Sequence, residues 1–113
     1  TGKPRREFLY VDDLAEACVM LINVDKANLD KITDKMSAHI NVGCGEDLTI
    51  KDLAITVKEI INYKGEIKFD INKPDGTPQK LLNSGKIKSL GWNANVSLKN
   101  GLLKTYKDYL SSK

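Results

Sequence analysis

The sequence predicts a small mixed α/β lobe with two or three short strands and about four helices. Short apolar runs beside glycine indicate the strands, and apolar residues repeated every three or four positions indicate the helices. Residues 39–70 have the order strand, helix, strand with short links, which is typical of a parallel, right-handed crossover unit. The chain contains neither an internal repeat nor a low-complexity segment.

The first helix is predicted directly after an apolar run at residues 8–11. Asp12 or Asp13 can cap it. Its apolar residues recur at helical spacing, which gives it one buried face: Leu14, Ala17, Cys18 and Leu21. Residues 23–37 are rich in Asp, Lys and Asn, so they are predicted to form a surface connection with no function of its own.

The middle of the chain carries the clearest start and stop signals. Residues 39–43 form a short apolar run that predicts a strand closed by glycine. Thr49 and Asp52 have the spacing of a capping box at the start of a helix, and Gly65 is predicted to end that helix. Polar and apolar residues alternate over residues 66–70, which predicts a half-buried strand.

The last part of the chain is predicted to hold a loop and two helices. Residues 72–80 are rich in proline and glycine and predict a rigid loop, followed by a short extended piece at Leu81–Leu82. Ser84 can cap a brief helix that Gly91 terminates. Ser97 can cap the final helix.

The composition excludes several classes of protein. A length of 113 residues allows one domain, and the net charge of +3 comes from interspersed signs, which favours a solvated surface over a nucleic-acid site. No apolar run approaches the ~20 residues of a membrane span, and no signal peptide opens the chain. Cys18 and Cys44 have neither metal-site spacing nor the density of a disulfide-rich domain, so both are predicted to be structural thiols of a soluble, cytoplasmic protein without a metal site.

Three side chains are candidates for binding an anionic ligand. Arg6 is the first, because a guanidinium presents a planar fork of donors that meets two phosphate oxygens at once. The alternative for Arg6 is a surface ion pair with Glu7 or Asp12. Lys80 is a second candidate cation by the same argument. Asp75 can accept hydrogen bonds from ribose hydroxyls or from the N–H edge of guanine, although an ordinary Asp-Gly turn is the alternative.

Other motifs carry no predicted chemistry. The Gly43-Cys44-Gly45 turn lacks the third glycine of a dinucleotide fingerprint, and the carboxylates that follow it would repel a pyrophosphate. His39 has no catalytic partner at a suggestive spacing, and Trp92 is predicted to be a core residue. The sequence contains no Gly-rich dinucleotide turn after a strand, so we expect no catalytic and no cofactor-binding residue in this chain.

Four motifs occur in a characteristic order. They are REFLYVDDLAEA at residues 6–17, HINVGCGEDLTIKDLA at 39–54, KPDGTPQKLLNS at 73–84 and SLGW at 89–92. In this order they resemble the C-terminal part of the extended short-chain dehydrogenase/reductases that act on nucleotide sugars, the NAD-dependent epimerase/dehydratase family. The KPDGTP loop followed by Lys80 points within it to the GDP-L-fucose synthases. The resemblance covers residues 2–109.

The resemblance implies a division of labour between this chain and a Rossmann domain that it does not contain. The chain, residues 1–113, would be one substrate-binding lobe, a C-terminal fragment whose parent is an NADP-dependent GDP-4-keto-6-deoxymannose 3,5-epimerase/4-reductase. The missing domain would bind NADP(H) and carry the catalytic residues, so the lobe alone is expected to be inactive. The parent is expected to be cytoplasmic, with a homodimer among its expected assemblies and neither nucleic acid nor membrane as a partner.

The resemblance also assigns roles to particular residues. Arg6, Asp75 and Lys80 would contact the GDP-sugar, with residues 72–80 as the ligand loop, while Arg5 is expected to face solvent. Gln79 stands where the family leads us to expect an arginine. Two alternatives remain open. The chain could be the same lobe of another nucleotide-sugar epimerase or dehydratase, or a stand-alone module that binds an anion or a nucleotide.

Overall fold

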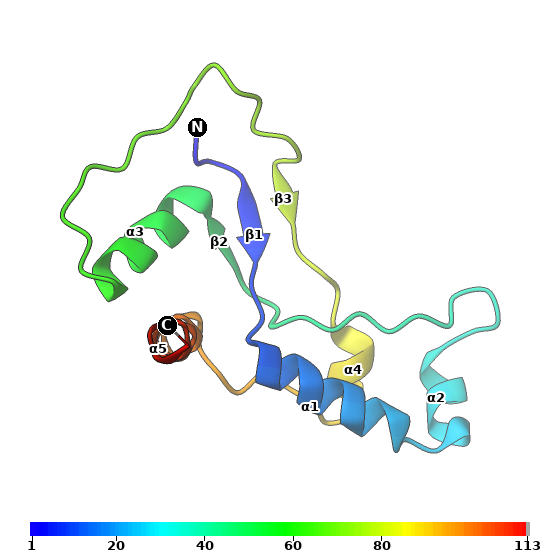
Figure 1. Ribbon diagram of the computed structural model, residues 1–113. Coiled ribbons are helices and arrows are strands. Elements are labelled where there is room, and N and C mark those ends of the chain that lie inside the picture. Colours follow the sequence, from blue (N-terminus) through cyan, green and yellow to red (C-terminus); the bar gives the residue numbers. More distant parts are fainter. Residues whose placement is uncertain (113) are drawn as a thin grey trace.

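The structure is a computed structural model, and it describes residues 1–112. These residues form a mixed α/β fold with three strands and five helices, which confirms the predicted class (Figure 1). In chain order the elements are β1 (Arg5–Glu7), α1 (Val11–Ile22), α2 (Lys26–Ile32), β2 (Asp47–Thr49), α3 (Ile50–Ile60), β3 (Gln79–Lys80), α4 (Gly85–Ser89) and α5 (Leu98–Ser111).

The three strands form one sheet with β1 in the centre. β1 pairs antiparallel with β2, so that Arg6 lies opposite Leu48, and parallel with β3, so that Arg6 lies opposite Lys80. Because side chains alternate between the two faces of a strand, Arg6 and Lys80 share one face, and Arg5 and Gln79 share the other. The sheet thus joins the start of the chain to the end of the 72–80 loop.

The strands predicted at residues 39–43 and 66–70 are wrong, and with them the parallel crossover unit. The structure has no strand in either segment. β2 and β3 occupy the two edges of β1, so neither segment finds a ladder partner there. The strand lies just before the extended piece predicted at Leu81–Leu82, because β3 covers only Gln79–Lys80.

Two predicted caps are confirmed. Thr49 accepts a hydrogen bond from the backbone N–H of Asp52 at the start of α3, and Ser97 accepts one from the N–H of Asn100 at the start of α5. Gly91 ends α4 with a φ of 93°, as predicted.

Other predicted caps are wrong. The residue before α1 is Tyr10, so Asp12 and Asp13 lie inside the first turn. Carboxylates at this end of a helix stabilise it, because they interact favourably with the helix dipole. Ser84 precedes α4, but its hydroxyl donates to the carbonyl of Gly43 instead of capping. Asn62, not Gly65, adopts the left-handed conformation after α3, with a φ of 55°. Asparagine tolerates this conformation better than most residues.

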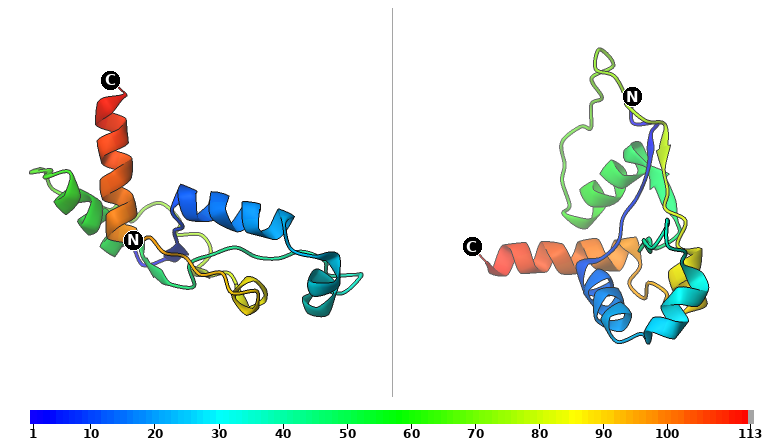
Figure 2. Two further views of the ribbon diagram at one scale, coloured as in Figure 1. Left: turned by 90° about the horizontal axis from the view of Figure 1, so that it is seen from below. Right: turned by 90° about the vertical axis from the view of Figure 1, so that its right-hand side faces the viewer.

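The core is small and lies where α1 and α4 meet. Ala17, Ile87 and Trp92 are buried, and Trp92 is only 3% exposed, so its predicted place in the core is confirmed. Helix α5 points away from α1, and the outline is open (Figure 2). The radius of gyration is 17.4 Å, against about 13 Å expected for a compact domain of this length. Within residues 1–112, no helix combines the length and apolar character that crossing a membrane requires.

Candidate functional site

Arg6 and Lys80 come together through the pairing of β1 with β3. They are direct partners across these two strands. Both line a hollow of about 450 Å³, which we call the Arg6–Lys80 hollow; its remaining lining residues are Glu7, Leu81 and Leu82. Two of the three predicted ligand residues therefore share one site.

Both cations of the hollow are available to a ligand. Arg6 donates from Nη1 to the carbonyl oxygen of Arg5 at 2.6 Å, and it forms no ion pair within residues 1–112. The alternative pairing of Arg6 with Glu7 or Asp12 is therefore absent from the described structure. Lys80 is exposed and likewise has no acidic partner among these residues. Like charges directly opposite each other in a sheet are destabilising, and an anion between them would relieve the repulsion.

The carboxylate of Glu7 joins three separate segments beside this hollow. One oxygen, Oε1, accepts a hydrogen bond from the backbone N–H of Gly45 at 2.6 Å. The other oxygen, Oε2, accepts one from the N–H of Leu82 at 3.1 Å. Sequence analysis missed this residue, because its partners are backbone groups 38 and 75 positions away. The Gly45 N–H is thus already occupied, which agrees with the prediction that this turn is no phosphate cradle.

A second polar network crosses all three strands. The Asp47 carboxylate accepts hydrogen bonds from Arg5 Nε at 2.8 Å and from Gln79 Nε2 at 2.5 Å, and it forms an ion pair with Arg5 Nη2 at 2.7 Å. The hydrogen bond from Gln79, followed by the one from Arg5, lowers the pKa of Asp47. Arg5 was expected to face solvent; it is 45% exposed, yet its guanidinium is held by Asp47. Gln79, which stands in place of an expected arginine, is held in the same network and not in the hollow.

Asp75, the third predicted ligand residue, contacts a different part of the chain from Arg6 and Lys80. Its carboxylate accepts a hydrogen bond from the Thr1 ammonium at 2.6 Å and another from the Thr1 hydroxyl. The bond to the ammonium is the main cause of the lowered pKa of Asp75. In Figure 1 the segment between α3 and β3 arches around the N-terminus, which places Asp75 beside Thr1. Asp75 does not line the Arg6–Lys80 hollow.

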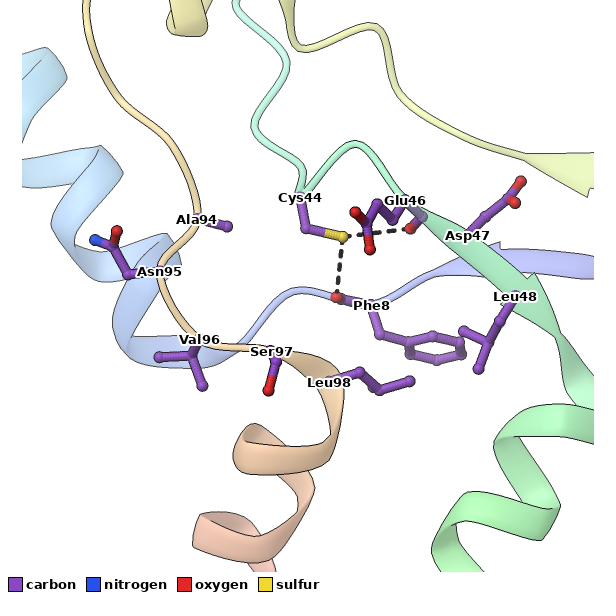
Figure 3. A pocket seen from close by; sticks show the side chains of 10 residues that line it. All are labelled: Phe8, Cys44, Glu46, Asp47, Leu48, Ala94, Asn95, Val96, Ser97 and Leu98. Carbon is purple, nitrogen blue, oxygen red and sulfur yellow. Dashed lines mark hydrogen bonds between the residues drawn. The ribbon is translucent and has the colours of Figure 1, made fainter.

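A second hollow, of about 470 Å³, lies between β2 and the start of α5 (Figure 3). Cys44 lines it, and its thiol contacts the carbonyl oxygens of Phe8 at 3.4 Å and Glu46 at 3.3 Å. No histidine lines this hollow to act as a base for the thiol. This geometry favours the predicted structural role of Cys44. Within residues 1–112, no group of three His, Cys, Asp or Glu side chains is placed to hold a metal ion.

Comparison with known proteins identifies relatives of this chain. The model of the NAD dependent epimerase/dehydratase family matches residues 1–43. GDP-L-fucose synthase 1 of Arabidopsis thaliana is 47% identical over 99% of this chain. This chain is related to the C-terminal part of the GDP-L-fucose synthases. It spans about a third of the length of the curated relatives it matches, 32% in the case of the Arabidopsis protein.

Solved structures of related proteins share the fold as well as the sequence. A GDP-6-OMe-4-keto-L-xylo-heptose reductase from Campylobacter jejuni superposes on the whole chain with a TM-score of 0.89 and 39% identity, and the match covers 33% of that protein. A GDP-D-glycero-L-gluco-heptose synthase from the same organism, solved in the presence of NADPH, gives a TM-score of 0.84 and 39% identity over 97% of this chain and 31% of its own. In each of these relatives, the segment that matches this chain is about a third of a larger protein.

Proposed function

We propose that this chain is the substrate-binding lobe of a GDP-4-keto-6-deoxymannose 3,5-epimerase/4-reductase, and that the Arg6–Lys80 hollow binds the diphosphate of the GDP-sugar. The observation that carries the proposal is the juxtaposition of two cations, on partner positions of β1 and β3, that have no acidic partner among the described residues. The relatives support the choice of ligand, because those compared above are named as GDP-sugar enzymes.

The contribution of the lobe to the reaction is binding and orientation. The Arg6 guanidinium donates two parallel hydrogen bonds to phosphate oxygens, and Lys80 adds a second charge from the neighbouring strand. Fixing the diphosphate in this way holds the sugar ring in one position relative to the catalytic groups, which lowers the entropic part of the barrier. Asp75, in the ligand loop 72–80, would accept hydrogen bonds from ribose hydroxyls or from the guanine N–H edge.

The chemistry itself is assigned to the part of the protein beyond this chain. NADPH, when bound there, supplies the hydride that reduces the keto group after epimerisation at two carbons. The solved heptose synthase supports the choice of cofactor, since it was crystallised with NADPH. The lobe alone would be inactive.

The principal partner of the lobe would be the cofactor domain of the same protein. The supporting observation is the exposure of large apolar side chains on the single helix α1, among them Val11, Leu14 and Ile22. We further propose a cytoplasmic protein that forms homodimers, with neither nucleic acid nor membrane as a partner.

The neighbouring arginines of β1 provide the test. In the whole protein, Arg6→Ala should weaken GDP binding by about 1.5–3 kcal/mol, the scale of a charged hydrogen bond. Arg5→Ala removes the same charge one residue away. Because the Arg5 guanidinium binds Asp47 on the other face of the sheet, the affinity for GDP should stay within about twofold of the wild type. Isothermal titration with GDP measures both constants, and the melting temperature of each variant reports its folding. An unchanged GDP affinity in a folded Arg6→Ala variant would contradict the proposal.

A further inference from the structure

Strand β3 is too short to hold the Arg6–Lys80 hollow in shape by itself. It has two residues and its pairing with β1 ends at Lys80. Two residues later, the N–H of Leu82 donates to the Glu7 side chain instead of to a carbonyl oxygen of β1. The Glu7 carboxylate therefore extends the contact between the two segments beyond the end of the ladder.

The same carboxylate also holds the turn that precedes β2. Its Oε1 accepts the N–H of Gly45 at 2.6 Å, within the range of a charge-assisted hydrogen bond. The approach depends on Gly43, because a Cβ at that position would lie 2.5 Å from Glu7 Oε1. One half-buried side chain thus links β1, the 43–45 turn and the segment after β3.

We propose that Glu7 is a positioning residue for the diphosphate site: its two hydrogen bonds fix the segment from Lys80 to Leu82 against β1 and so set the distance between the Lys80 ammonium and the Arg6 guanidinium. This inference rests on the proposed function of the hollow. Glu7 would not touch the ligand, and it acts through Arg6 and Lys80.

The negative charge of Glu7 and its proposed positioning role predict opposite effects of a Glu7 substitution on GDP binding. A carboxylate beside an anion site repels the ligand, so neutralising it by electrostatics alone should tighten binding. Glu7→Gln removes the charge and replaces one acceptor by an amide NH₂, which cannot accept from a backbone N–H. If Glu7 positions the cations, the loss of that bond weakens binding in spite of the lost repulsion.

The experiment is a GDP titration of the whole protein. Glu7→Gln should bind GDP about 10- to 150-fold more weakly, the scale of one lost hydrogen bond to a charged group. Glu46→Gln is the charge control, because Glu46 is exposed in the neighbouring turn and its carboxylate bonds to none of residues 1–112. It should bind GDP as tightly as the wild type or slightly more tightly.

A second control separates positioning from general stability. Asp13 also accepts hydrogen bonds from two backbone N–H groups, those of Asn95 and Val96, at another place in the fold; both bonds go to one oxygen, Oδ2. Asp13→Ala removes this acceptor, so it should lower the melting temperature and leave GDP affinity within about twofold. A Lys80→Ala background should also reduce the loss caused by Glu7→Gln, because coupled residues give non-additive effects.

The outcomes distinguish this inference from the proposed function. Unchanged or tighter GDP binding by Glu7→Gln, together with weaker binding by Arg6→Ala, would overturn the positioning role and leave the proposed function standing. Absence of GDP binding by the wild type would overturn both. If Glu7→Gln does not fold, Glu7→Asp keeps both acceptor oxygens on a side chain one methylene shorter; it should bind more weakly than the wild type, and wild-type affinity would overturn the inference.

Discussion

Three consecutive residues of β1 engage three different parts of the fold. Arg5 is held by Asp47 on one face of the sheet, Arg6 lies in the hollow on the other, and Glu7 ties down the turn and the segment beside it. Arg5 and Arg6 carry the same chemical group, so only the alternation of side chains along the strand separates a structural arginine from a candidate ligand contact.

Asp47 should make the stability of the protein depend on pH. Its pKa is lowered in the folded state, so its stabilising contribution is complete above the ordinary aspartate pKa of about 3.9 and is lost as the pH falls through the lowered value. Asp47→Asn should therefore melt below the wild type at neutral pH, and the gap should close in acid. Melting temperatures across this range measure the gap.

Glu59 supplies the control for that pH series. It is exposed on α3, and its carboxylate has no hydrogen bond or ion pair within residues 1–112. Glu59→Gln should show no gap at neutral pH. A difference between Asp47→Asn and the wild type that stays constant down to strongly acidic pH would refute the role given to the Asp47 network.

At the level of single residues, the sequence singled out two cations that the structure brings together, whereas it did not indicate the contacts of two carboxylates. Arg6 and Lys80 stand in motifs and need only a short strand to bring them together. Glu7 and Asp47 accept hydrogen bonds from groups that are distant in the sequence, and no local sequence pattern indicates those partners. Asp75 was predicted as a ligand residue and that role stays a prediction, since its contacts in the structure are to Thr1.

Helix starts could be predicted from neighbouring residues at two places in this chain, whereas the strands could not be predicted in this way. The caps at Thr49 and Ser97 were predictable because a hydroxyl and an N–H three residues later suffice to form them. The strands at 39–43 and 66–70 were wrong because a strand needs a partner, and β1 gives both of its edges to other segments. Short apolar runs do not reveal which of them will pair.

The cap of α3 gives a test at the scale of this element. Thr49→Ala removes the acceptor for the Asp52 N–H and should lower the free energy of unfolding by about 1 kcal/mol. Thr56→Ala is the matched change in the middle of the same helix; alanine favours a helix interior, so the cost there should be smaller or absent. Urea unfolding of both variants measures the difference, and equal costs would argue against the cap.

The whole molecule is open and poorly covered, which fits one lobe of a longer protein. Among residues 1–112, the core holds three buried apolar residues, while fourteen large apolar side chains are exposed, among them Met36, Ile71 and Leu110. If a cofactor domain covers part of this surface, the separately expressed chain should bind a hydrophobic dye strongly or self-associate. Dye fluorescence and light scattering, compared with the whole protein at equal molar concentration, measure this.

The comparison of the separately expressed chain with the whole protein could also contradict the lobe interpretation. A separately expressed chain that stays monomeric, unfolds cooperatively and binds no more dye than the whole protein would favour the stand-alone binding module. The open shape predicts the opposite.

The most direct test of the account is a crystal structure of the whole protein with GDP bound. We expect the diphosphate in the Arg6–Lys80 hollow, with phosphate oxygens within about 3 Å of both the Arg6 guanidinium and the Lys80 ammonium. The Glu7 carboxylate should still hold Gly45 and Leu82. A diphosphate bound elsewhere, with Arg6 and Lys80 both free of it, would contradict the central claim.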